Sequence, residues 1–125
     1  MSLSKAQIRQ KIYNLQREKT NYINEKSKYN TSLSYANKLL GSLKKENDNL
    51  MSVKNNLDKY FKLDGKGADN KEIERIKKEV LNLISKVEKT IIPGINNSIK
   101  SLNTKINNTD YNINYYNRLY GEAQE

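Results

Sequence analysis

Apolar side chains recur at alternating steps of four and three residues along most of this chain. From residue 8 to residue 61 the pattern misses no step, and twelve of its sixteen positions are apolar or aromatic. Such a repeat predicts a long helix that buries a narrow seam against a partner helix. The sixteen positions are Ile8, Ile12, Leu15, Lys19, Tyr22, Lys26, Tyr29, Leu33, Ala36, Leu40, Leu43, Asn47, Leu50, Lys54, Leu57 and Phe61.

Polar residues hold four of these positions, and three of the four are lysines. A lysine can lay its alkyl stem along a seam while its charge stays in water. Asn47 is expected to fix the register of helix pairing at some cost in stability. The start of the helix is predicted at Ser4, because Ser4 and Gln7 have the spacing of a capping box, in which each side chain satisfies a backbone donor of the other residue.

The helical pattern has one long interruption, near the middle of the chain. Leu63-Asp64-Gly65 opens this gap, and Gly65 with Gly67 can take positive φ at little cost. We therefore predict a helix–helix turn and an all-α fold, a long antiparallel, coiled-coil-like helical hairpin in one domain, 1–125. Its first leg covers about 4–63, the turn 64–69 and the second leg about 70–120.

The second leg repeats the pattern less regularly. Between residues 87 and 99 the seam advances by fours, and Pro93-Gly94 falls inside this drift. Proline removes a helix hydrogen bond, so we expect kinks near Pro93 and near Gly41, which the hairpin register places level with Ile91. A three-helix bundle with a true turn at Pro93-Gly94 is the alternative fold. The predicted seam is Ile73, Ile76, Val80, Leu83, Val87, Ile91, Ile95, Ile99, Leu102, Ile106, Thr109, Ile113, Tyr116 and Tyr120.

Further apolar residues lie beside the seam, and tyrosines gather near the end of the second leg. A two-helix hairpin has one internal contact face, so a second apolar stripe points to a protein partner; a slightly wide seam is the alternative. Tyrosines are common interface anchors, and Tyr13 could complete a patch with those of the second leg. The candidate partner-binding residues are Ile23, Leu39, Met51, Val53, Leu81, Ile84, Tyr111, Tyr115 and Tyr120.

The amino-acid composition limits the kinds of functional site that we expect. The chain has no Cys and no His, and no residues are arranged as a catalytic, cofactor-binding or metal-binding site, so we expect no enzyme and no cofactor. No apolar run is long enough to span a membrane. No Sec-type signal follows Met1, so we expect a cytoplasmic protein whose export, if any, would take a non-Sec route with a partner.

Charge leaves a second function open. The net charge is +9, and thirteen of the 23 basic residues lie in residues 1–62. A basic leg can face phosphate, so a basic coiled-coil protein that binds nucleic acid, or one with a structural or phage role, is the alternative. The lysines are spread around the helix rather than gathered on one stripe, which disfavours nucleic acid.

The chain resembles the small helical-hairpin, WXG-like proteins encoded beside LXG toxins in Gram-positive bacteria. The resemblance lies in the Ile8, Ile12, Leu15 opening of leg one, in Leu63-Asp64-Gly65 at the turn, and in Ile99, Leu102, Ile106 of leg two. It implies binding to the helical N-terminal domain of an LXG toxin for type VII secretion, together with a second small hairpin protein.

Two positions differ from the family pattern. Leu63 stands where the family turn often has Trp, and Tyr120 is followed four residues later by Gln124 rather than by an acid. The resemblance thus implies an adaptor or targeting chaperone that depends on the export signal of its partner. An isolated chain could also form a homo-oligomer through the same apolar residues.

Overall fold

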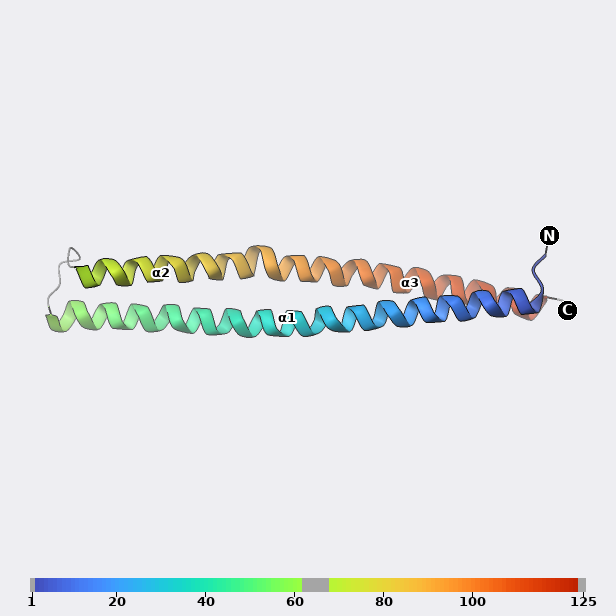
Figure 1. Ribbon diagram of the computed structural model, residues 1–125, viewed down its shortest axis with the longest axis horizontal. Coiled ribbons are helices and arrows are strands. Elements are labelled where there is room, and N and C mark those ends of the chain that lie inside the picture. The colour runs from blue at the N-terminus through green and yellow to red at the C-terminus, as the bar shows by residue number, and fades with distance from the viewer. Residues whose placement is uncertain (1, 62–67, 124–125) are drawn as a thin grey trace. The chain divides into compact units, whose positions relative to one another are not determined.

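The chain is all-α in the part that the structure, a computed structural model, describes. The backbone is described for residues 2–61 and 68–123 and the side chains for residues 2–56 and 71–123. Helix α1 covers Lys5–Phe61, α2 covers Ala68–Lys86, a π-helix follows at Val87–Ile91, and α3 covers Ile92–Glu122 (Figure 1). The predicted residues Leu63, Asp64 and Gly65 lie outside the described residues. Ala68 and Asp69, predicted in the turn, already belong to α2.

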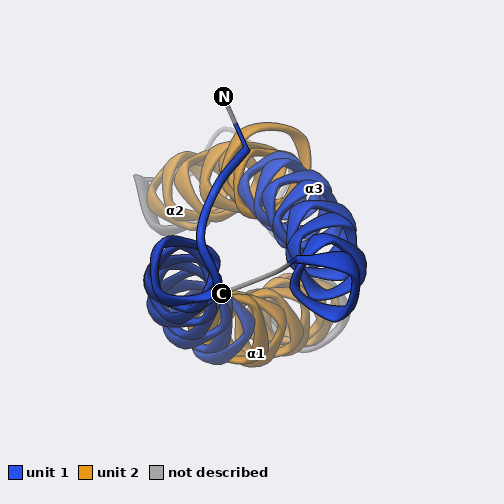
Figure 2. Ribbon diagram, turned by 90° about the vertical axis from the view of Figure 1, so that its right-hand side faces the viewer, with its two compact units in different colours: residues 1–31, 96–125 blue, residues 32–95 orange. Residues whose placement is uncertain are grey.

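The helices pair as the two legs of a hairpin, in two compact units (Figure 2). Unit 1 consists of residues 1–31 and 96–125, and unit 2 of residues 32–95. In unit 1, Lys11 lies over the ring of Tyr116, and Lys105 lies over the ring of Tyr22. Residue numbers thus rise along one leg as they fall along the other. The legs of unit 1 are therefore antiparallel.

Unit 2 shows the same direction through ion pairs. Lys44 and Glu88 are 3.0 Å apart, and Lys54 pairs with Glu74. The pair Lys44–Glu88 supports the prediction that Gly41 and Ile91 lie at the same level of the hairpin. Lys44 is three residues after Gly41, and Glu88 is three residues before Ile91. In unit 1 the register differs slightly from the prediction: Tyr120, expected to meet Ile12, lies beside Lys5 and Arg9.

The predicted start of α1 is confirmed. The backbone N–H of Ser4 donates to Gln7 Oε1 at 2.9 Å, and the N–H of Gln7 donates to Ser4 Oγ at 3.2 Å. Both halves of the capping box are thus formed, and two donors that the first helical turn leaves unpaired are satisfied.

The α1 seam follows the sequence pattern without a departure. All predicted seam positions from Ile8 to Lys54 are buried or half-buried, whereas every other residue from 6 to 56 is exposed. Ile8 and Ala36 are the most enclosed, at 2% and 8% exposure. A period of 3.5 residues therefore describes the whole described length of this leg.

Gly41 does not interrupt α1. The helix runs through it, and a Cβ added there would meet nothing within 4 Å. No close approach of other atoms therefore requires glycine at position 41, and the residue is a glycine tolerated at an exposed helix position.

The second leg departs from the predicted seam at two places. Leu83 and Ile91, both predicted inside, are 51% and 38% exposed, and the half-buried residues are Ile84 and Ile92 instead. The seam then keeps steps of four and three on both sides of one five-residue step, from Val87 to Ile92. The observed seam is Ile73, Lys77 with its equally half-buried neighbour Ile76, Val80, Ile84, Val87, Ile92, Ile95, Ile99, Leu102, Ile106, Thr109, Ile113, Tyr116 and Tyr120.

The π-helix explains the five-residue step. The N–H of Ile92 donates to the carbonyl of Val87, five residues back, so this turn contains one residue more than an α-turn. Pro93 follows at once, in the first turn of α3, where a missing N–H is tolerated. The irregularity expected near Pro93-Gly94 is thus a widened helical turn, and the chain does not turn back there as a three-helix bundle requires.

One polar seam residue is incompletely satisfied. The side-chain oxygen of Asn47 is buried and accepts no hydrogen bond from the described residues. By contrast, Thr109, 4% exposed, donates its hydroxyl to the Lys105 carbonyl at 2.7 Å. Asn47 therefore carries a desolvation cost that Thr109 avoids.

We expect Asn47→Leu to raise the free energy of unfolding by about 1–2 kcal/mol, because it removes a buried acceptor without a donor and adds apolar burial. Urea unfolding followed by circular dichroism measures this change. Asn49→Leu, at an exposed position of the same helix, is the matched control. Equal effects of the two substitutions would show that burial at position 47 is not the cause.

Candidate partner-binding surfaces

Exposed apolar side chains lie along both legs outside the seam. Of the nine candidate residues from the sequence, seven are exposed; Ile84 and Tyr120 are half-buried because both belong to the seam. Sequence reasoning missed Leu83, Ile91 and Tyr35, which are exposed as well. The exposed candidates are Ile23, Leu39, Met51, Val53, Leu81, Tyr111 and Tyr115, with exposed fractions from 38% to 68%.

Both legs of unit 1 have tyrosines, several of them near the chain ends. Tyr115 meets Tyr116 edge to face, with ring centroids 5.2 Å apart. The described residues include no ring contact between Tyr13 and either Tyr111 or Tyr115, and Arg17 lies over Tyr13 instead. Tyr13, Tyr111 and Tyr115 are each exposed, and the three-tyrosine patch stays a prediction.

Cations cover the seam tyrosines at this end. Lys5 and Arg9 lie 5.2 and 5.7 Å from the Tyr120 ring centre, and Lys11 lies 5.8 Å from that of Tyr116. These contacts cross between the legs of unit 1 and favour their pairing. They also occupy ring faces that stacking bases would need, which disfavours this end as a platform for single-stranded nucleic acid.

A shallow hollow of about 400 Å³ lies near the chain ends of unit 1. Leu3, Ile8, Tyr115 and Leu119 contribute to its lining, and Glu122 gives it one carboxylate. Ser2 and Ala123 complete the lining, so the hollow is of mixed polarity.

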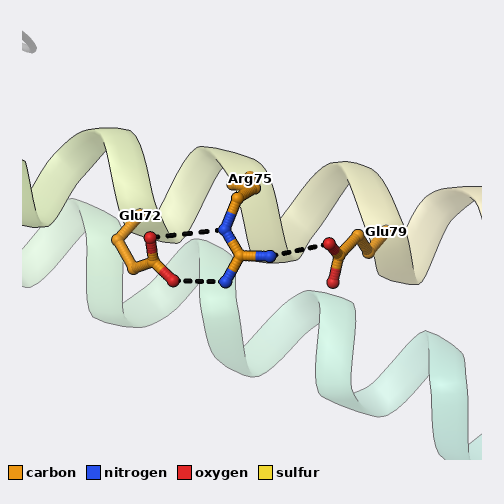
Figure 3. A network of polar contacts seen from close by, with 3 residues as sticks. All are labelled: Glu72, Arg75 and Glu79. Carbon is orange, nitrogen blue, oxygen red and sulfur yellow. Dashed lines mark hydrogen bonds and ion pairs between the residues drawn. The ribbon is translucent and has the colours of Figure 1, made fainter.

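Charged residues of α2 are paired among themselves. Arg75 donates to Glu72 three residues back and, at 2.7 Å, to Glu79 four residues on (Figure 3). These bonds raise the pKa of Arg75 and lower that of Glu72. Two carboxylates thus offset this guanidinium, which leaves it a poor contact for phosphate.

The ion pair between Lys54 and Glu74 joins the two legs of unit 2. Its hydrogen bond, followed by its Coulombic attraction, lowers the pKa of Glu74. A lowered pKa in the folded state means that the unfolded chain binds protons first as the pH falls. The contribution of this pair is therefore present above the ordinary glutamate pKa of about 4.3 and is lost as the pH falls through the lower, folded value.

We expect Glu74→Gln to reduce the acid dependence of stability, with a small effect because the pair is exposed. Thermal melting of both proteins from neutral pH down to below the carboxyl pKa measures it. Glu79→Gln is the control, because Glu79 lies on the same helix and its ion pair is with Arg75 of that helix rather than with α1. A wild-type and a Glu74→Gln protein with parallel acid profiles would contradict the assignment.

The described residues offer little else to a ligand. They include no group of three or more acidic, His or Cys residues that could hold a metal ion. Among the helices described, none is long and apolar enough to cross a membrane. Comparisons with protein families, curated proteins and solved structures find no match.

Proposed function

We propose that this chain is a partner-binding adaptor or targeting chaperone that pairs with the helical N-terminal domain of an LXG-type toxin for type VII secretion. The observation that carries the proposal is the set of exposed apolar side chains on legs whose seams are already paired. Leu39, Val53, Leu81 and Leu83 are 44% to 51% exposed, although each lies beside the seam. A second protein would remove this surface from water, which favours association.

The toxin class comes from the resemblance of the seam and turn residues to the LXG-associated hairpin proteins. In this proposal the chain has no catalytic step, takes no cofactor and acts by covering helical surface of its partner. A second small hairpin protein would join the same assembly. The export signal would come from the partner, since Gln124 stands where an acid is expected.

Co-expression with the helical N-terminal domain of an LXG toxin encoded beside this chain tests the proposal. We expect one complex in size-exclusion chromatography with light scattering, and its survival at high salt, because burial of apolar surface is insensitive to ionic strength. Nucleic-acid binding would instead weaken steeply with salt. A chain that remains a monomer beside the toxin domain would overturn the proposal.

A further inference from the structure

Unit 2 has two flanks, one on each side of its seam. Lys44 directly follows the seam residue Leu43, and its ion-pair partner Glu88 directly follows Val87. Residues that follow such seam positions therefore share one flank, as in antiparallel coiled coils. Residues that directly precede Leu40, Ile84 and their equivalents then share the opposite flank.

The opposite flank has the half-buried Ile76 and four exposed apolar residues, which we name the apolar flank: Leu39, Val53, Leu83 and Ile91. Their exposed fractions are 50%, 47%, 51% and 38%. Leu39 and Val53 are two heptads apart on α1. Leu83 and Ile91 are eight residues apart, and the extra residue of the π-helix keeps Ile91 directly before the seam residue Ile92. The π-helix thus brings both legs' apolar rows to one side.

Glu46 interrupts this flank midway. It lies seven residues from both Leu39 and Val53, it is exposed, and no ion pair joins it to a described residue. Two copies of the chain packed about a two-fold axis at the centre of this row would bring their Glu46 carboxylates together. Like charges at an interface centre oppose association, whereas a cation opposite Glu46 favours it.

We propose that the apolar flank is the docking site for an amphipathic helix of a different protein that places a lysine or arginine opposite Glu46. This inference rests on the proposed function and specifies the surface and the partner chemistry. The ion pairs Lys44–Glu88 and Lys54–Glu74 place Leu39 level with about Ile91, Glu46 with about Leu83, and Val53 with about Ile76. Apolar side chains of that helix would lie between the legs at the two outer levels. The helix would lie along the hairpin as a third strand of a coiled coil.

Two synthetic amphipathic helices test the charge. They share leucines at heptad spacing and differ only in a central lysine or glutamate, and fluorescence anisotropy measures their binding to the full chain. We expect the lysine peptide to bind about fivefold more tightly than the glutamate peptide. Glu46→Lys should invert this preference. No binding by either peptide, or a preference unchanged in Glu46→Lys, would overturn the proposal.

A pair of double variants tests the location. Leu39→Lys with Leu83→Lys should weaken lysine-peptide binding by about tenfold or more, because both anchors are lost. Asn37→Lys with Asn82→Lys adds the same charge at exposed positions away from the apolar flank and should leave binding unchanged. Circular dichroism checks that both variants are folded. Equal losses in the two double variants would overturn the assigned flank.

Two further measurements separate the possible outcomes. Self-association of the wild-type chain in sedimentation velocity that Leu39→Lys with Leu83→Lys abolishes would identify a second copy as the occupant and overturn this inference. A toxin-domain complex that survives the same double variant would overturn the flank while the proposed function stands. Absence of any toxin-domain complex would overturn the proposed function itself.

Discussion

Leu102→Ala should lower the free energy of unfolding by about 2–5 kcal/mol, the range for removing a large aliphatic side chain from a packed core. Leu102 is 4% exposed and lies in the α3 seam of unit 1. The substitution removes apolar contacts and leaves a cavity between the legs, because helices held along their length by a seam cannot collapse locally to fill it. Urea unfolding followed by circular dichroism gives the change directly.

Leu83→Ala is the matched control, since it makes the same chemical change on the same leg at 51% exposure. We expect a loss below about 1 kcal/mol, as for substitutions at exposed positions. The comparison also tests the corrected seam, because the sequence pattern places both leucines inside. A loss at Leu83 as large as that at Leu102 would restore the pattern predicted from sequence.

Most of the fold follows from the periodicity of the chain. On α1 each seam position has an exposed residue on either side, so only one phase of the 4-3 repeat is apolar and the seam has a single solution. The cap is equally local, because Ser4 and Gln7 bond to each other's backbone. Neither feature needs information from distant parts of the chain.

The second leg is ambiguous because apolar residues are adjacent at its decisive points. Leu83 stands beside Ile84 and Ile91 beside Ile92, so two phases of the repeat are available. A fixed helical period must choose one phase for the whole leg, whereas the π-helix changes phase within one turn. The signal that favours the observed phase is the clean 4-3 run from Ile92 to Tyr120, which extends backward to Val87 only with a five-residue step.

The apolar flank could likewise be predicted from the sequence on one leg only. Leu39 and Val53 were predicted as partner residues because the α1 seam is unambiguous. Leu83 and Ile91 were assigned to the seam, because their exposure depends on the extra residue of the π-helix. The apolar flank is therefore visible in the sequence of one leg and appears on the other only when the hydrogen bond from Ile92 to Val87 is known.

Deleting Thr90 from a Pro93→Ala protein should preserve the fold, whereas deleting Ser101 from the same background should destroy unit 1. Thr90 lies in the π-helix, and its removal turns the five-residue step from Val87 to Ile92 into a regular step of four. The proline is replaced first because its ring would clash with a carbonyl in the regular α-helix that results. The seam before the deletion and the seam after it then continue one another in a regular α-helix.

Deleting Ser101 instead rotates everything after it by about 100° relative to the preceding helix. Leu102 and Ile113, which are buried in the wild-type protein, would leave the seam. The loss of burial would lower the free energy of unfolding by about 1.5–3 kcal/mol for each. Helix content and thermal unfolding by circular dichroism distinguish the two deletions. If the Thr90 deletion is as damaging as the Ser101 deletion, the π-helix does more than absorb one residue, and its wider turn is itself required for the pairing of unit 2.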